Sequence, residues 1–192
     1  VFNSILDDEK GGRFSISAVD AVDNRQIYFP DTNILITRFG SDHSAAQVTD
    51  FMPVHEEHDL SGDPWTGDSG ELCCSDSKVI RLAHGVLGKT NMRMECTPAF
   101  EFASTDHQVE KTANGVIFTS DNGQKLSLTA ECEFEIENGT AFANFTLDHG
   151  ESVAFVLEQL SESAEDQTSL TASEADEQFK ETVEFWRDWV SK

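Results

Sequence analysis

The 192-residue sequence has few cations: Lys and Arg total 13 against 36 Asp and Glu, and the formal net charge is −23. Proteins that bind nucleic acids need clustered cations to displace counterions from phosphates, and anionic membranes also attract basic surfaces. We therefore expect no nucleic acid and no membrane among the partners. The acidity itself is typical of a solvated surface.

Long hydrophobic runs are also missing. No stretch approaches the roughly 20 apolar residues that a membrane-spanning helix needs. The chain opens on Val1 and Phe2, with neither an initiator Met nor a signal peptide. We therefore expect a domain cut from a longer, cytoplasmic protein.

Cysteine is scarce, with four residues at 73, 74, 96 and 132. The adjacent pair at 73 and 74 does not have the C-x-x-C spacing of a zinc site. A disulfide between Cys96 and Cys132 is one alternative, and reduced thiols, as in cytosolic proteins, are the favoured one.

Motifs that would carry catalysis or bind a metal are not found either. His55 and His58 flank two glutamates, but a zincin helix needs its histidines four apart, and here they are three apart in a segment without helical pattern. Residues 63–71 are acidic but lack the ligand alternation of a calcium loop. No nucleophile elbow, P-loop or dinucleotide fingerprint occurs, and no carboxylate pair stands among apolar neighbours. We expect no catalytic residue, no metal site and no cofactor.

The sequence is rich in short alternating segments and in Phe, with 14 Phe against one Tyr. In residues 132–137 (CEFEIE) the apolar side chains of Phe134 and Ile136 share one face, as in a half-buried strand. Such spacing predicts a mainly β fold in which two antiparallel sheets pack face to face over residues 1–158. The expected strands are 13–18, 25–29, 32–39, 45–53, 78–87, 90–97, 99–103, 107–112, 115–120, 124–130, 132–137, 140–147 and 151–158.

Turn signals separate these segments. Asp121-Asn-Gly123, Glu137-Asn-Gly139 and Asn114-Gly115 have the residues that supply positive φ in hairpin turns. Pro30-Asp31 suits a turn in which proline presets φ at the first central position.

The end of the chain changes character, and residues 159–192 are expected to form a linker followed by an amphipathic helix. Thr171-Ala-Ser-Glu174 is a capping box that marks the helix start. An apolar stripe follows, each member of which stabilises by about 1.5–3 kcal/mol when it is buried. We expect this stripe to contact the sandwich in part and to form a domain interface in part. The interface residues are Phe179, Val183, Trp186, Trp189 and Val190, with Phe185 beside them.

Residues 55–77 are predicted to form a long loop, because they are rich in Gly, Asp and Ser and have no periodicity. Trp65 stands alone in this polar setting. It is a candidate for stacking on a carbohydrate or for contacting another domain, while packing back against the sandwich is the favoured alternative.

Three ordered segments resemble a known family: VFNSILDDEKGGRFSI (1–16), RQIYFPDTNILITRF (25–39) and AQVTDFMPV (46–54). The chain resembles the N-terminal domain of bacterial and archaeal glycoside hydrolase family 15 proteins, the glucoamylase-like and trehalase-like enzymes. The resemblance continues through VIRLAHGVLGKTNMRMECTPAFEFA (79–103) and ends with FWRDWV (185–190). Ala99 and Phe102 stand where that family usually has Arg and Tyr.

The resemblance implies a super-β-sandwich, a helical linker and then an α/α barrel that holds the catalytic glutamates. It implies that the parent protein is an inverting α-glucosidase of glucoamylase, glucodextranase or trehalase type. The chain would be its non-catalytic domain, with its own barrel as partner and an α-glucosidic carbohydrate bound nearby. Two alternatives stay open: an independent carbohydrate-binding module, and a structural oligomerisation domain in which the C-terminal helix pairs with a second copy.

Overall fold

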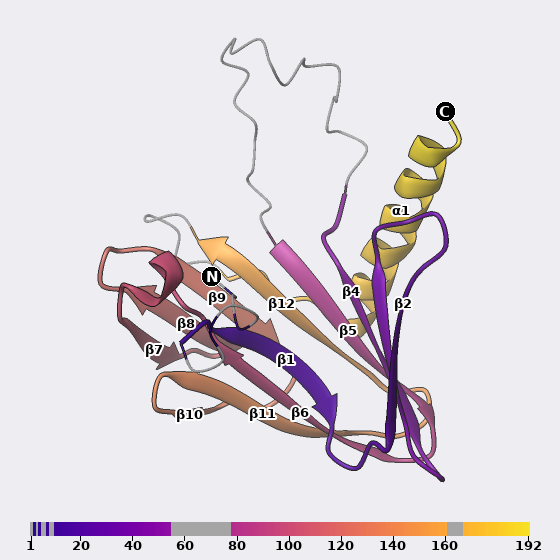
Figure 1. Cartoon of the computed structure of the whole chain (residues 1–192), viewed down its shortest axis with the longest axis horizontal. Coiled ribbons are helices and arrows are strands. Elements are labelled where there is room, and N and C mark those ends of the chain that lie inside the picture. Colours follow the sequence, from indigo (N-terminus) through magenta and orange to yellow (C-terminus); the bar gives the residue numbers. More distant parts are fainter. Residues whose placement is uncertain (1, 3, 5–6, 8–9, 55–77, 161–166) are drawn as a thin grey trace.

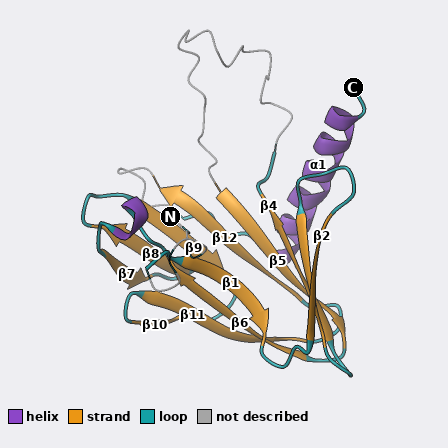
Figure 2. Ribbon diagram, viewed as in Figure 1, coloured by secondary structure: helices purple, strands orange, loops and turns teal. Residues whose placement is uncertain are grey.

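A computed structural model describes residues 2, 4, 7, 10–54, 78–160 and 167–192. Within these residues, two antiparallel sheets and one long helix form the molecule (Figures 1 and 2). One sheet has four strands in the order β1-β6-β11-β10, and the other has eight in the order β2-β3-β4-β5-β12-β9-β8-β7. The predicted class, a mainly β antiparallel sandwich with a C-terminal helix, is confirmed.

The elements agree closely with the strands expected from sequence. The four-stranded sheet comprises β1 (Arg13–Ala18), β6 (Thr90–Thr97), β10 (Glu135–Glu137) and β11 (Thr140–Leu147). The eight-stranded sheet comprises β2 (Asp23–Tyr28), β3 (Leu35–Gly40), β4 (Ala45–Phe51), β5 (Lys78–Leu87), β7 (His107–Lys111), β8 (Gly115–Ser120), β9 (Lys125–Ala130) and β12 (Ser152–Leu160). The helix is α1 (Ala172–Val190).

One expected strand, residues 99–103, is wrong. Instead a short 3-10 turn, η1 (Glu101–Ala103), occupies this place, and only an isolated bridge joins Phe100 to Thr105. The reason is the backbone: Glu101, Phe102 and Ala103 all have positive φ, which no strand can adopt.

Two of the predicted hairpin turns are confirmed by their dihedral angles. Asn138 and Gly139 have φ of 50° and 76°, as a type I′ turn between β10 and β11 requires. Asp31 follows Pro30 with φ of 59°, which matches the second central position of a type II turn. Gly123 also has a positive φ, 90°.

The positive φ predicted for Asn114-Gly115 is wrong, because neither residue has it. A turn does join β7 and β8 here, closed by a hydrogen bond of 2.8 Å from the backbone N–H of Thr112 to the backbone oxygen of Gly115. Gly115 is instead required by a close approach of two strands: a Cβ placed on it would lie 2.0 Å from the carbonyl oxygen of Leu128. A glycine therefore serves here because it has no side chain.

The main core lies between the two sheets. It contains Met92, Met94, Phe118, Leu128 and Phe155, each at most 1% exposed. These side chains come from alternate positions of β6, β8, β9 and β12, as expected for the inner faces of a sandwich.

A second, smaller core lies on the outer face of the eight-stranded sheet, where α1 covers β5 and β12 (Figure 1). Ile80, Leu82, Ala154 and Val156 point to this side, opposite to their neighbours Ala83 and Phe155. Strands β5 and β12 are therefore buried on both faces, and the domain has three layers. Strand β2, at one edge of the same sheet, is exposed along its whole length.

A part-buried ion pair ties the two sheets together. Arg81 of β5 donates from Nε and Nη2 to the two carboxylate oxygens of Asp50 on β4, at 2.8 and 2.9 Å. Its Nη1 donates to the backbone oxygen of Phe14 on β1, in the other sheet, and its guanidinium lies 4.7 Å from the Phe14 ring centroid. Asp50 belongs to the VTDFMP motif, so this motif residue has an architectural role in the chain.

Candidate functional site

The start of α1 is fixed by the predicted capping box. Thr171 Oγ1 accepts from the backbone N–H of Glu174, and Glu174 accepts from the backbone N–H of Thr171. Hydrogen bonds from the backbone and side chain of Thr171 hold the pKa of Glu174 below its ordinary value. One turn later, Lys180 and Asp176 form an ion pair at 2.7 Å, which raises the pKa of Lys180. These local contacts fix where the helix begins and so which of its faces meets the sheet.

The first two thirds of α1 pack on the protein's own sheet. Ala175, Thr182 and Val183 are buried, and Phe179 makes edge-to-face contacts with Phe29 and Phe51 at centroid distances of 5.6 and 5.9 Å. The structure therefore places two of the predicted interface residues, Phe179 and Val183, against the sandwich.

The last turns of α1 extend beyond that contact and carry its largest apolar side chains. Trp186 lies between Phe185 and Trp189, with ring centroids 5.5 and 5.8 Å away. Trp189 and Val190 are 57% and 54% exposed. The buried Nε1 of Trp186 has no hydrogen-bond partner among the described residues. We call residues 185, 186, 189 and 190 the aromatic end of α1.

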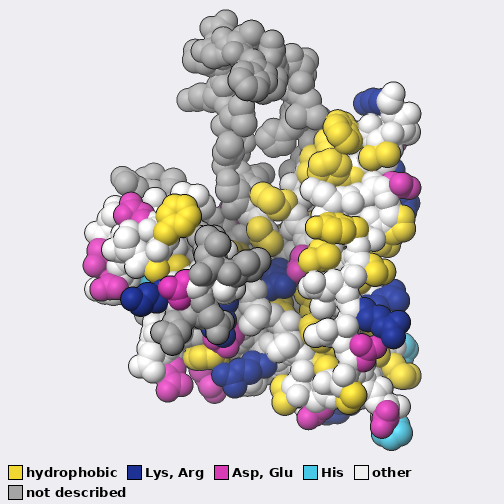
Figure 3. Space-filling model, viewed as in Figure 1, with side chains coloured by type: hydrophobic (Ala, Val, Ile, Leu, Met, Phe, Trp, Pro, Cys, Tyr) yellow, Lys and Arg dark blue, Asp and Glu magenta, His cyan; other side chains and the backbone are white. Residues whose placement is uncertain are grey.

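Exposed apolar residues also occur on the strands beside the helix. Tyr28 and Met52 are 68% and 54% exposed. Tyr28 immediately precedes Phe29, and Met52 immediately follows Phe51; both of these Phe rings contact Phe179 of α1. Arg187 of the helix lies over the Phe29 ring at 5.4 Å. Figure 3 shows apolar side chains gathered along the column formed by the β2–β3 hairpin and α1. Contiguous exposed apolar surface is a common feature of protein–protein interaction sites.

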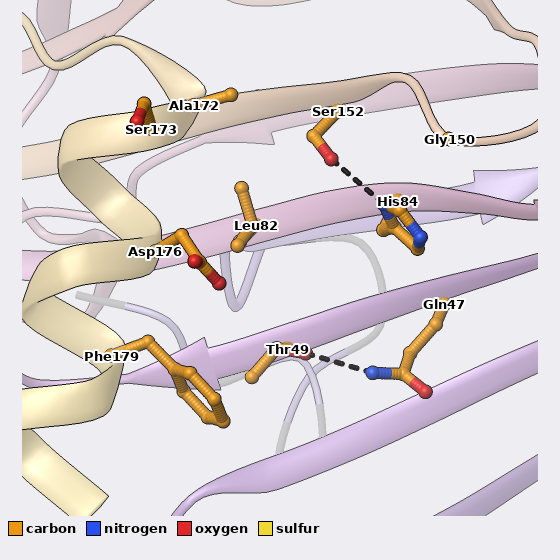
Figure 4. A pocket seen from close by; sticks show the side chains of 10 residues that line it. All are labelled: Gln47, Thr49, Leu82, His84, Gly150, Ser152, Ala172, Ser173, Asp176 and Phe179. Atoms are coloured by element: carbon orange, nitrogen blue, oxygen red, sulfur yellow. Dashed lines mark hydrogen bonds between the residues drawn. The ribbon is translucent and has the colours of Figure 1, made fainter.

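A groove of about 480 Å³ lies on the outer face of the eight-stranded sheet, beside the N-terminal half of α1 (Figure 4). Its floor is polar: His84 Nδ1 lies 2.8 Å from Ser152 Oγ, and Gln47 Nε2 donates to Thr49 Oγ1 at 3.2 Å. The Asp176 carboxylate and the Phe179 ring border it from the helix side (Figure 4). Hydroxyl, amide and imidazole groups beside one ring can bind a hydroxylated ligand.

A second hollow, of about 580 Å³, lies at the other end of the sandwich. It is lined by polar side chains of β1, β6 and β7, including Arg13, Glu95 and His107, and by Ala103 and Thr105 of the turn around η1. His107 Nε2 is 2.9 Å from the backbone oxygen of Gly139, which fixes the ring in place.

Cys96 and Cys132 are free thiols rather than a disulfide. Burial raises the pKa of both, that of Cys132 to about 11. Both are therefore protonated near neutral pH and poor nucleophiles. Among the residues that the structure describes, no three His, Cys, Asp or Glu side chains gather in a way that could hold a metal ion.

Several predicted features lie outside the described residues. These are Trp65, the His55–His58 pair, the acidic segment 63–71 and the whole expected loop 55–77. The role of Trp65 therefore stays a prediction. The sequence analysis named Phe102 as a departure from the family but did not predict that it is 82% exposed. It also missed the Asp50–Arg81 pair, for which the sequence gives no signal.

No family model matches the chain. It is similar to trehalases of two archaea, Thermoplasma volcanium and Thermoplasma acidophilum, with 25% identity over 198 residues in both alignments. Each alignment covers 100% of this chain, and 28% and 30% of the respective trehalase. The resemblance to trehalase-like proteins is confirmed.

The chain thus spans less than a third of the length of the curated trehalase relatives that it matches. Among solved structures, a putative kojibiose phosphorylase from the human microbiome is similar at a TM-score of 0.48 and 8% identity. That alignment covers 91% of this chain and 25% of the phosphorylase chain. The only described helix, α1, is not long and apolar enough to cross a membrane.

Proposed function

We propose that this trehalase-like chain is the non-catalytic N-terminal β-sandwich domain of a glycoside hydrolase family 15-like α-glucosidase. It supports a catalytic α/α barrel and borders the barrel's substrate site. Residues 1–158 form the sandwich in this proposal, and residues 159–192 form the linker and helix that lead to the barrel. The parent is an inverting glucoamylase, glucodextranase or trehalase, and it is cytoplasmic.

The observation that carries the proposal is the aromatic end of α1. Trp189 and Val190 leave more than half of their surface in water. Exposed apolar side chains of this size call for a neighbour that supplies apolar surface. This chain covers less than a third of the length of the trehalase relatives, so the rest of a protein of that length would be long enough to supply such a neighbour.

The test compares the 192-residue chain with the intact parent polypeptide. We expect the chain alone to hydrolyse none of trehalose, maltose and isomaltose, and the intact polypeptide to hydrolyse one of them with inversion at the anomeric carbon. In the intact polypeptide, Trp189→Ala should lower the melting temperature of the catalytic domain. Val22→Ala should not, because Val22 is 85% exposed and lies just before β2, at the end of the strand away from the Phe29 contact with α1. Turnover by the chain alone would refute the proposal.

The groove of Figure 4 favours a second candidate, a carbohydrate-binding module, because its polar side chains are already fixed by hydrogen bonds. Saturable binding of maltose or trehalose that is lost in His84→Ala would favour this candidate. The matched control is His149→Ala, a histidine outside the groove whose Nδ1 lies 2.8 Å from the backbone oxygen of Val86.

The exposed aromatic end of α1 also fits a third candidate, an oligomerisation domain. In that case the chain would sediment as a dimer, and Trp186→Ala or Trp189→Ala would shift it to a monomer. A monomer at all concentrations would exclude this candidate.

A further inference from the structure

The turn η1 has a backbone that is unusual for its residues. Glu101, Phe102 and Ala103 have φ of 46°, 58° and 66°, three consecutive residues in the left-handed region and none of them Gly or Asn. Side chains other than those of Gly, Asn and Asp disfavour this region, and such conformations persist only where the surroundings impose them.

The surroundings do impose it. The carboxylate of Glu101 accepts from Asn122 Nδ2 through Oε1 and from Thr105 Oγ1 through Oε2, both at 2.8 Å. Its backbone oxygen accepts from the N–H of Ser104 at 3.3 Å and from the Ser104 hydroxyl at 2.7 Å. Glu101 therefore accepts four hydrogen bonds, two through its carboxylate and two through its backbone oxygen, and these bonds hold the turn in place.

The base of the turn is anchored in the core. Phe100 is 1% exposed, pairs with Thr105 through a β-bridge, and has its ring centroid 5.6 Å from that of His107. The turn is thus a rigid projection from the sandwich rather than a loose loop.

The side chain that the turn exposes to solvent is the phenyl ring of Phe102. Phe102 is 82% exposed, the most exposed aromatic side chain of the described residues. Stability of the domain alone would favour a polar residue or Gly at this position. A strained backbone that persists because its surroundings support it often marks a functional position, which makes the exposed Phe102 a candidate contact residue.

The position of the turn indicates which partner it meets. Glu101 of the turn bonds to Asn122 between β8 and β9, at the end of the eight-stranded sheet where β12 ends and β5 begins. In Figure 1, α1 points its C-terminal residues beyond that same end. A domain that follows α1, as the proposed function requires, would start at this end of the sandwich. The trehalase relatives are more than three times as long as this chain, which is consistent with a further domain of that size.

We infer that the turn 101–103 presents Phe102 as a rigid knob that inserts into an apolar socket of the polypeptide following residue 192. This second contact is separate from the aromatic end of α1, and together the two contacts fix the orientation of the following domain. The inference rests on the proposed function for the existence of that domain.

The test places the photoreactive residue p-benzoylphenylalanine at position 102 of the intact parent polypeptide, followed by irradiation and peptide mapping. A matched control carries it at position 22, where Val22 is 85% exposed and precedes β2, the edge strand farthest in the sheet order from β7 and the turn before it. We expect crosslinks from position 102, and not from position 22, to peptides beyond residue 192. Crosslinks only within residues 1–192, only between two copies, or none at all would overturn the inference.

Substitutions give a second, functional readout. Phe102→Ala should speed the thermal inactivation of the intact polypeptide about tenfold, and Phe102→Tyr, which keeps the ring, should restore the original rate. Ala103→Gly is the control for the turn itself, because it relaxes the backbone but retains the knob; it should not speed inactivation. Equal inactivation rates for Phe102→Ala and the unmodified polypeptide would overturn the inference.

Failure of the inference and failure of the proposed function can be distinguished. Glycosidase activity without a crosslink from position 102 to the following polypeptide would refute the knob alone. A crosslink beyond residue 192 in a polypeptide that hydrolyses no α-glucoside would refute the proposed function and support the knob.

Discussion

Removal of the Asp50 carboxylate should be the most damaging single change to a polar side chain in this domain. Among the described residues, Asp50→Ala leaves the Arg81 guanidinium between the two sheets with the Phe14 carbonyl and ring as its remaining partners. Breaking a buried pair in this way destabilises by about 3–5 kcal/mol, because it leaves an uncompensated charge. The Asp50 and Arg81 side chains are 18% and 15% exposed to solvent, so water partly screens the charge that is left on Arg81. We therefore expect the low end, about 3 kcal/mol.

The free energy of unfolding, from urea denaturation followed by circular dichroism, measures this effect. For a chain of this size the loss corresponds to a drop in melting temperature of about 6–12 °C. The matched control is Asp23→Ala, which breaks an ion pair with Arg25 whose side chains are 61% and 79% exposed. An exposed pair contributes about 0.2–1 kcal/mol, so the control should change little.

A double variant, Asp50→Ala with Arg81→Met, separates the two contributions. Because it removes the stranded charge together with the carboxylate, it should be more stable than the sum of the single changes by about 1–2 kcal/mol. Strictly additive losses, or a loss below about 1 kcal/mol for Asp50→Ala, would contradict the role given to this pair.

Three further results are expected of the chain. Ala103→Gly should raise the free energy of unfolding in urea by about 0.5–1 kcal/mol, since Gly tolerates the positive φ, whereas Ala21→Gly, at an exposed position without it, should lower it. Thr171→Ala should lower stability at pH 7 by about 1 kcal/mol through loss of the helix cap. The pKa of Glu174 is lowered in the folded chain, so its carboxylate stabilises the fold at pH values above its ordinary pKa. This stabilisation is lost as the pH falls through the pKa that Glu174 has in the folded chain. The difference in stability between Thr171→Ala and the unmodified chain should therefore shrink in acid. Cys96 should resist iodoacetamide at pH 8 in the folded chain and react once urea unfolds it, as peptide mass spectrometry would show, because burial both hides the thiol and raises its pKa.

Most strands could be predicted because they are short, alternating and bounded by turn residues. The segment 140–147 (TAFANFTL), for example, lies within the predicted limits as β11. The segment PAFEFA alternates just as well but is not a strand. Its conformation depends on Asn122 and Thr105, which contact Glu101 only in the folded chain. Periodicity reports which side chains share a face, and it carries no information on such tertiary contacts.

The helix was predictable for the same kind of reason, while its surroundings were not. The capping box at Thr171 and the apolar spacing indicate where α1 begins and which residues form its stripe. They do not indicate where along the stripe the sheet ends. Phe179 contacts Phe29 and Phe51, whereas Trp189 extends beyond them, and this division depends on the lengths of β4 and β5.

Hydrogen exchange of the backbone amides in residues 184–192 tests most directly whether the aromatic end of α1 has a partner. The measurement compares this chain with the intact parent polypeptide by mass spectrometry under identical conditions. If the following domain covers Trp189 and Val190, these amides should exchange at least about 100-fold more slowly in the intact polypeptide, which equals about 2.7 kcal/mol of added protection. Equal exchange rates in the two would show that nothing covers this end of the helix and would contradict the account.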